Sequence, residues 1–138
     1  MTTLTPQDEE HLRLLAIFHY VVAGITALFS LIPIAHITVG ILMVMGKLES
    51  GPGDATEPVW MGWLFIAMGG VWMAAGLALA VCLALAGRYL RRREHYMFCL
   101  VIACIACIFT PFGTVLGIFT IIVLLRQSVK DAFAAAAA

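Results

Sequence analysis

Three long stretches of this chain carry no Asp, Glu, Lys or Arg, and they cover residues 14–46, 58–87 and 95–125. Each stretch is roughly 30 residues long, whereas about 20 apolar residues suffice to cross a bilayer core of about 30 Å. We therefore expect α-helices that lie in a membrane and that tilt, project from it or turn back.

Two prolines divide the first and the third stretch. Pro33 follows Ser30-Leu31-Ile32, and Pro111 opens the segment Pro-Phe-Gly-Thr. Because proline lacks a backbone N–H and clashes with the preceding turn, a helix usually ends before it, and a new helix can begin at it. The sequence favours a hairpin at each proline, with a kink in one long span as the alternative.

The predicted fold is an all-α integral membrane bundle of four to five membrane helices in one domain, residues 1–138. Turns or breaks are expected at Pro33 and Pro111. The expected helices cover residues 6–32, 34–47, 59–88, 95–110 and 112–131. They leave a predicted outer loop, 47–58, and a predicted cytoplasmic arginine loop, 88–94.

The positive charges predict an orientation. Short loops rich in Lys and Arg usually lie in the cytoplasm, and four arginines fall close together, at Arg88, Arg91, Arg92 and Arg93. Arg126 and Lys130 indicate that the C-terminal flank is cytoplasmic too. An even number of crossings is then expected between these two regions, as a hairpin at Pro111 would give.

The loop 47–58 carries one Lys and three acidic residues, which fits the outer side of the membrane. The side of the N-terminus depends on Pro33. A hairpin there would place the N-terminus outside, and a kink would place it in the cytoplasm.

The composition agrees with a membrane protein and excludes other classes. Apolar residues make up 63% of the chain and charged residues 12%, against about 25% charged in typical soluble domains. The eight Lys and Arg are balanced by eight Asp and Glu, which argues against a basic nucleic-acid-binding face. The sequence has no catalytic motif and no carboxylate inside the apolar stretches, so we expect no enzyme activity, no catalytic residues and no metal site.

Small residues predict where helices pack. Membrane helices approach closely where small side chains line one face. The middle stretch has such residues at four-residue spacing, namely Gly70, Ala74, Ala78, Cys82 and Ala86, and a second shallow track of Gly69, Met73, Gly76 and Ala80. The last predicted pair of helices offers Gly113 and Gly117.

Two histidines, His19 and His36, are the strongly ionisable side chains inside the apolar stretches. Polar groups within a membrane are expensive and are candidates for function. Either histidine could hold a haem, pigment or quinone, although no cofactor is predicted outright. The alternative is a neutral histidine that bonds to a neighbouring carbonyl or hydroxyl group.

The C-terminal segment Pro111–Leu125, which reads PFGTVLGIFTIIVLL, resembles an element found in small uncharacterised bacterial membrane proteins. That element follows the pattern P-x-G-T-x-L-G-x-x-T-x-x-V-L, and the N-terminal segment His11–Tyr20 is similar to the same group. The resemblance implies a small polytopic protein of the bacterial inner membrane. It carries no catalytic residue and no assigned function to this chain.

Three hypotheses about function follow. The leading one is a non-catalytic accessory or scaffolding subunit of a larger membrane complex, or a homo-oligomer, whose partners are membrane lipid and other subunits or itself. The second is a small pore lined by Thr110, Thr114, Thr120 and His36. The third is a module that binds haem, pigment, quinone or lipid through His19 or His36.

Overall fold

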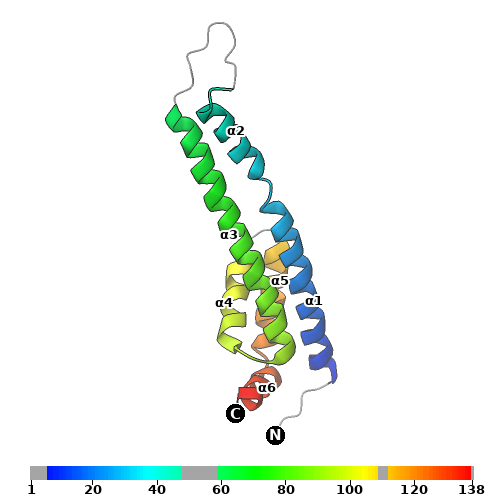
Figure 1. The fold of residues 1–138 in the computed structure, drawn as a ribbon. Coiled ribbons are helices and arrows are strands. Elements are labelled where there is room, and N and C mark those ends of the chain that lie inside the picture. Colours follow the sequence, from blue (N-terminus) through cyan, green and yellow to red (C-terminus); the bar gives the residue numbers. More distant parts are fainter. Residues whose placement is uncertain (1–5, 48–58, 109–111, 138) are drawn as a thin grey trace. The chain divides into compact units, whose positions relative to one another are not determined.

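Helices make up the computed structural model, which describes residues 6–47, 59–108 and 112–137. In chain order they are α1 (Pro6–Phe29), α2 (Ile34–Val44), α3 (Val59–Arg92), α4 (Tyr96–Ala106), α5 (Phe112–Leu124) and α6 (Gln127–Ala137) (Figure 1). The described residues contain no strand, which confirms the predicted all-α class.

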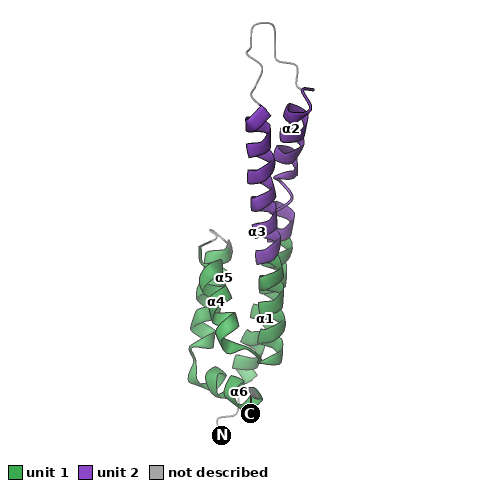
Figure 2. Ribbon diagram, turned by 60° about the vertical axis from the view of Figure 1, so that its left-hand side comes forward, with its two compact units in different colours: residues 1–25, 80–138 green, residues 26–79 purple. Residues whose placement is uncertain are grey.

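The chain divides into two compact units, where the sequence predicted one domain (Figure 2). The first unit consists of residues 1–25 and 80–138, and the second unit consists of residues 26–79. The helices α1 and α3 contribute to both units. The second unit contains α2, and the first contains α4, α5 and α6.

In the second unit, glycines allow the backbones of neighbouring helices to touch. A Cβ atom placed on Gly40 would lie 2.7 Å from the carbonyl oxygen of Gly62, and one on Gly76 would lie 2.6 Å from Cβ of Ser30. A Cβ atom on Gly69 would lie 2.9 Å from Cγ1 of Ile37. These distances are too short for a methyl group, so glycine is what permits α2 and α3 to approach this closely.

The chain does not reverse at Pro33. Residues 30, 37 and 40 lie against residues 76, 69 and 62 in that order, so the chain keeps one direction along α3 and runs antiparallel to it. Between α1 and α2 the N–H groups of Leu31 and Ile32 bond to carbonyls three residues back, as in a 3₁₀ turn. The hairpin favoured at Pro33 is therefore not observed. The α-helical hydrogen-bond pattern is interrupted there, but the residues on both sides of Pro33 pack along α3 in the same direction.

Side chains from five helices form the interior of the first unit. The largest fully buried ones come from α1, α3, α4, α5 and α6, and they are His19, Leu83, Leu90, Cys99, Thr120, Leu124 and Val129. The first unit therefore has a core of packed side chains, whereas in the second unit the contact of α2 with α3 is made at glycines.

The helices α4 and α5 are antiparallel neighbours in the first unit. The hydroxyl of Tyr96, at the start of α4, donates to the carbonyl oxygen of Leu124, at the end of α5, over 3.1 Å. At the other end, the Thr114 hydroxyl donates to the carbonyl oxygen of Cys107 over 2.9 Å. The chain reverses direction between the two helices, but Pro111 itself lies outside the described residues, so a turn at this proline stays a prediction.

The helix predicted over residues 112–131 is in fact two helices, α5 and α6, bent by 78° to each other. The break falls at Leu125 and Arg126, where the apolar stretch ends. The bend lets α6 bury Val129 and Phe133 in the core of the first unit, where Phe133 meets the ring of Tyr96 edge-on. A straight continuation of α5 would have carried these two side chains away from that core.

Two helical stretches of the described chain are long and apolar enough to cross a membrane, Pro6–Val44 and Val59–Arg92. The bent α5–α6 pair is a third candidate if it counts as one span. The predicted four to five spans exceed this number. The reason is that Pro33 does not turn the chain back and that α4 and α5 have 11 and 13 residues.

Candidate functional site

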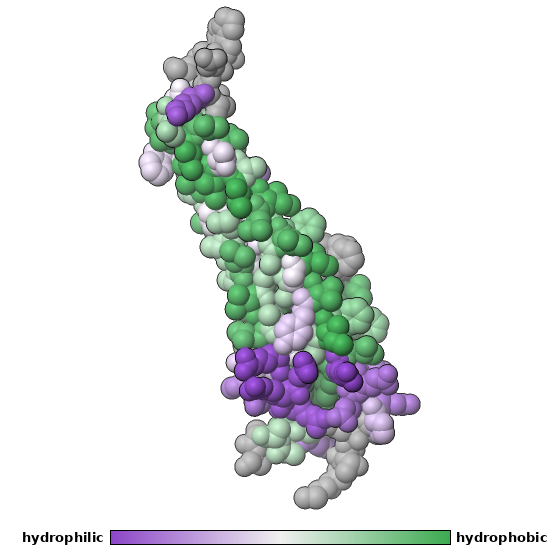
Figure 3. Space-filling view, turned by 45° about the vertical axis from the view of Figure 1, so that its right-hand side comes forward, coloured by the Kyte–Doolittle hydropathy of each residue, from purple (hydrophilic) through white to green (hydrophobic). Residues whose placement is uncertain are grey.

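Charged side chains of the first unit gather where α1 begins and α3 ends. Among the described residues, every Asp, Glu, Lys and Arg except Lys47 belongs to this unit. Figure 3 shows them as a hydrophilic band that borders an apolar surface. We call this region the charged end; it comprises residues 8–13 of α1, residues 88–94, and residues 126–131.

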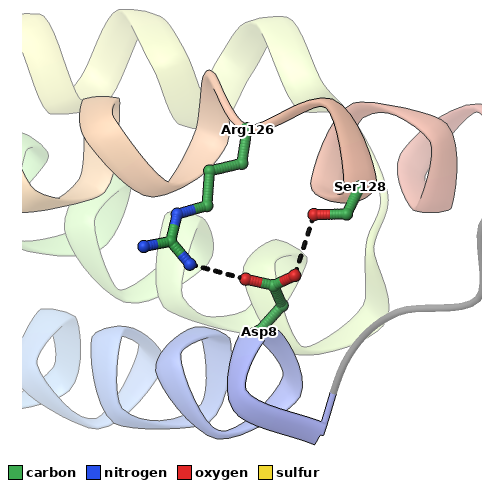
Figure 4. Close-up of polar contacts among 3 residues, drawn as sticks. All are labelled: Asp8, Arg126 and Ser128. Carbon is green, nitrogen blue, oxygen red and sulfur yellow. Dashed lines mark hydrogen bonds and ion pairs between the residues drawn. The ribbon is translucent and has the colours of Figure 1, made fainter.

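The best-buried polar contact of the charged end ties α1 to α6 (Figure 4). One carboxylate oxygen of Asp8 accepts a hydrogen bond from Nη1 of Arg126 over 2.8 Å, and the other accepts one from Oγ of Ser128 over 2.8 Å. The Asp8 side chain is only 5% exposed, whereas that of Arg126 is 48% exposed. The carboxylate also lies beside the first turn of α6, where the positive end of the helix dipole favours an anion.

A second ion pair ties α1 to the end of α3. Nη2 of Arg93 lies 3.0 Å from Oε1 of Glu9, and both side chains remain partly exposed. Arg93 takes a positive φ of 59° directly after α3, and the N–H of Glu94 bonds back to the carbonyl oxygen of Tyr89. This is the left-handed ending that usually requires glycine. The N-terminus of α1, the arginines and α6 therefore lie together in one unit.

The role of Asp8 was not predicted, although the sequence contains a signal for it. Asp8 lies on the face of α1 that also buries Leu12, Leu15, His19 and Ala23. The spacing of these residues is that of one helix face. An acidic residue that falls on the buried face of a helix is expected to have a hydrogen-bond or ion-pair partner, because an unpaired buried carboxylate is costly.

His19 is fully buried on α1 in the first unit. Its Nδ1 lies 2.9 Å from the carbonyl oxygen of Leu15, one turn earlier, so Nδ1 carries the proton and Nε2 the lone pair in the neutral ring. Nε2 is buried without a hydrogen-bond partner among the described residues. The backbone of α3 is close by, since a Cβ atom on Gly87 would lie 3.1 Å from Cβ of His19.

His36 lies in the second unit on α2 and is exposed. Its ring stacks on that of Phe65 with the ring centres 6.3 Å apart. The structure therefore does not bring the two predicted histidines into one site within either unit. His36 offers its ring at the surface, whereas His19 is enclosed.

Of the predicted packing residues on α3, Ala86 is fully buried in the first unit, but Gly70, Ala74, Ala78 and Cys82 are not buried. A Cβ atom on Gly70 would have nothing within 4 Å, and Ala74 and Ala78 are exposed while Cys82 is half-buried. The track that packs contains Gly69 and Gly76, which the sequence analysis placed second. In α5 the outcome differs: Gly113 is buried, and a Cβ atom on Gly117 would lie 2.5 Å from the carbonyl oxygen of Ala103 on α4.

The threonines proposed to line a pore have other partners. Thr120 is fully buried and its hydroxyl donates to the carbonyl oxygen of Leu116 over 2.7 Å. The Thr114 hydroxyl is used between α4 and α5, and Thr110 lies outside the described residues. The hydroxyl groups of Thr114 and Thr120 are thus satisfied by backbone carbonyl oxygens, and these contacts give the pore hypothesis no support.

No group of three His, Cys, Asp or Glu side chains that could hold a metal ion occurs among residues 6–47, 59–108 and 112–137. No protein-family model matches the chain, and comparisons with curated proteins and with solved structures find no match either. The likeness of the C-terminal segment to small bacterial membrane proteins therefore stays a resemblance.

Proposed function

We propose that this chain is a non-catalytic membrane subunit that packs against other membrane helices, either as an accessory or scaffolding subunit or as a homo-oligomer. One observation carries the proposal. The small-residue track of Gly70, Ala74 and Ala78 on α3 is open among the described residues: Ala74 and Ala78 are exposed, and a Cβ atom on Gly70 would meet nothing within 4 Å, although such tracks suit close helix approach. Exposed apolar side chains, among them Val71 and Leu77, flank it.

We place this subunit in a membrane with the charged end in the cytoplasm. The stretch Pro6–Val44 has 39 residues and Val59–Arg92 has 34, more than the roughly 20 that a crossing needs. The arginines at the end of α3 favour the cytoplasmic side. Because Glu9 pairs with Arg93 and Asp8 with Arg126, the N-terminus belongs on that side too, which is the arrangement expected for a kink at Pro33. A bacterial inner membrane fits the resemblance of the C-terminal segment.

We further propose that the α4–α5 pair enters the membrane from the cytoplasmic side and returns to it. At about 1.5 Å per residue, the 11 residues of α4 and the 13 of α5 extend roughly 17 and 20 Å, less than a bilayer core of about 30 Å. Both helices connect to charged segments at their far ends, namely residues 88–94 and 126–131. Two full spans and one re-entrant hairpin then leave both termini in the cytoplasm.

The subunit proposal is tested by mass measurement of the full chain released from native membranes in mild detergent. We expect a complex heavier than one chain. The double variant Ala74→Leu/Ala78→Leu should reduce that mass, because leucines would hold a neighbouring helix away. Ala75→Leu is the matched control, since Ala75 is also exposed on α3 but lies off the track. A lone monomer from native membranes would contradict the proposal, and an unchanged mass in the double variant would show that this track is not the contact.

A second candidate function rests on the buried Nε2 of His19. An imidazole fixed through Nδ1–H directs its other nitrogen toward a ligand, as in haem and chlorophyll sites. A purified protein with visible absorbance that His19→Leu abolishes would support this function. Organic extraction followed by mass spectrometry would detect a colourless quinone or lipid. If the protein has no visible absorbance and extraction yields no molecule at about one per chain, this function is wrong and His19 is a packing residue.

A further inference from the structure

An open hollow of about 420 Å³ lies between α1 and α3 at the charged end of the first unit. Its lining consists of Tyr20 from α1 and Arg88, Arg91 and Arg92 from α3. The three arginines follow each other at the spacings of one helix face, so their side chains lie on the same side of α3. Tyr20 lies against Gly87, the residue before Arg88, because a Cβ atom on Gly87 would be 3.5 Å from its Cε2.

The charges around this hollow favour an anion. No carboxylate lines it, and within the described residues none of its three arginines forms an ion pair. Two acids of the charged end pair with other arginines, Glu9 with Arg93 and Asp8 with Arg126, while Glu10 and Glu94 do not line the hollow. The adjoining hollow differs, because its lining includes Glu9 as well as Arg13, Arg91 and Arg93.

The position of the hollow along the chain suggests which anion it meets. Arg88 is the first charged residue after the apolar stretch 58–87, so the hollow lies where the chain leaves the hydrocarbon core. Tyrosine is frequent at this level of a membrane. Guanidinium groups match phosphate oxygens in geometry, and basic hollows between membrane helices on the cytoplasmic side suit anionic headgroups.

We propose that the hollow formed by Tyr20, Arg88, Arg91 and Arg92 binds the phosphate of an anionic phospholipid from the surrounding leaflet. The arginines supply charge and paired N–H donors, and the Tyr20 hydroxyl supplies one more donor. The acyl chains would extend along the apolar surface that borders the charged end (Figure 3). This inference rests on the membrane placement proposed above and is independent of the helix contact at Ala74 and Ala78.

The test compares lipid retention by the full chain in detergent micelles supplemented with phosphatidylglycerol or phosphatidylcholine, read by native mass spectrometry. We expect retained phosphatidylglycerol at defined stoichiometry and little phosphatidylcholine. The variant Arg88→Gln/Arg92→Gln should weaken phosphatidylglycerol retention on the order of tenfold, because each arginine at a membrane surface contributes several-fold. Tyr20→Phe should cost less, since it removes one donor and no charge.

A matched control distinguishes lipid binding in the hollow from a general attraction of anionic lipid to the positive charges of this end. Arg13→Gln/Lys130→Gln removes the same charge from the same end but leaves the hollow intact, so it should change retention little. Equal losses in the two double variants would overturn the proposal in favour of a diffuse surface potential. Unchanged thermal unfolding of the variants, together with partial recovery in Arg88→Lys/Arg92→Lys, excludes a folding defect as the cause of a loss.

Further outcomes distinguish a lipid phosphate from a free phosphate ester, and this inference from the proposed membrane placement. Complete displacement of phosphatidylglycerol by soluble glycerol phosphate would mean that the hollow takes a free phosphate ester, and the lipid assignment would be wrong. A chain that inserts into vesicles but shows no preference for phosphatidylglycerol would overturn this inference alone. A chain that fails to insert into vesicles at all would overturn the membrane placement as well.

Discussion

In the second unit α2 and α3 meet through glycine, so that backbone lies on backbone at Gly40 and Gly62. In the first unit the interior is filled by side chains from five helices, and a polar clamp at Asp8 joins α1 to α6. The contact of α2 with α3 therefore depends on glycines. In the first unit close glycine contacts, at Gly87 and Gly117, accompany a side-chain core that spreads its packing over many contacts and carries charge at one end.

We therefore expect substitutions in the two units to affect stability in different ways. Changes in the first unit should lower the stability of the whole chain, because it joins segments distant in sequence. Changes in the second unit should loosen α2 locally, because most of its helix surface is already exposed. Four substitutions, from the largest expected effect to the smallest, test this difference.

Gly117→Leu should cause the largest loss. A side chain there would collide with Cys107 and with the carbonyl oxygen of Ala103, and α4 would have to move. We expect a destabilisation of about 3 kcal/mol, at the upper end for overpacking, measured by thermal unfolding in detergent. Gly24→Leu is the control, since a Cβ atom on Gly24 has nothing within 4 Å. Equal effects of the two variants would contradict the packing of α4 on α5.

Asp8→Ala should come next. It removes both hydrogen bonds of the clamp and leaves Arg126 and Ser128 without their partner, at a cost of about 2 kcal/mol. Amide hydrogen exchange should speed up throughout α6. The exposed Glu10 provides the control, and Glu10→Ala should leave α6 protected. Unchanged exchange in the Asp8 variant would mean that α6 is held by Val129 and Phe133 alone.

Gly76→Ala should destabilise the second unit by about 1–2 kcal/mol. The added methyl group meets Cβ of Ser30, the residue that follows α1. In a Ser30→Gly background that atom is gone, so the same substitution should cost much less. A double-mutant cycle measures this coupling, with amide exchange of α2 as the readout. Additive effects would show that Gly76 and Ser30 do not touch.

Glu9→Gln should have the smallest effect. The Glu9 side chain is 69% exposed, and exposed ion pairs contribute about 0–1 kcal/mol. Thermal unfolding at low and at high salt should differ little between this variant and the parent chain. A loss as large as that of Asp8→Ala would contradict the view that burial, rather than charge alone, makes the Asp8 clamp strong.

The two small-residue tracks of α3 differ in which one packs within the chain. A four-residue repeat drifts about 40° around a helix at each step, whereas a seven-residue repeat drifts only about 20°. Gly62, Gly69 and Gly76 follow the seven-residue spacing, so they stay turned toward an antiparallel neighbour. The four-residue track through Gly70 and Ala74 leaves that face, and the spacing alone could have indicated this.

The sequence by itself determined the helical class, the apolar stretches and the clustering of charge, because these follow from local composition and from the length of a bilayer crossing. The tertiary structure decided the rest. Pro33 removes an N–H in either a kink or a hairpin, and only the contacts of α2 with α3 distinguish the two. Likewise the sequence shows Asp8 only as an acidic residue in the first turn of a helix. Its partners Ser128 and Arg126 are brought to it by the bend between α5 and α6. Such choices depend on which surfaces meet, and contacts between residues far apart in the chain leave little trace in local patterns.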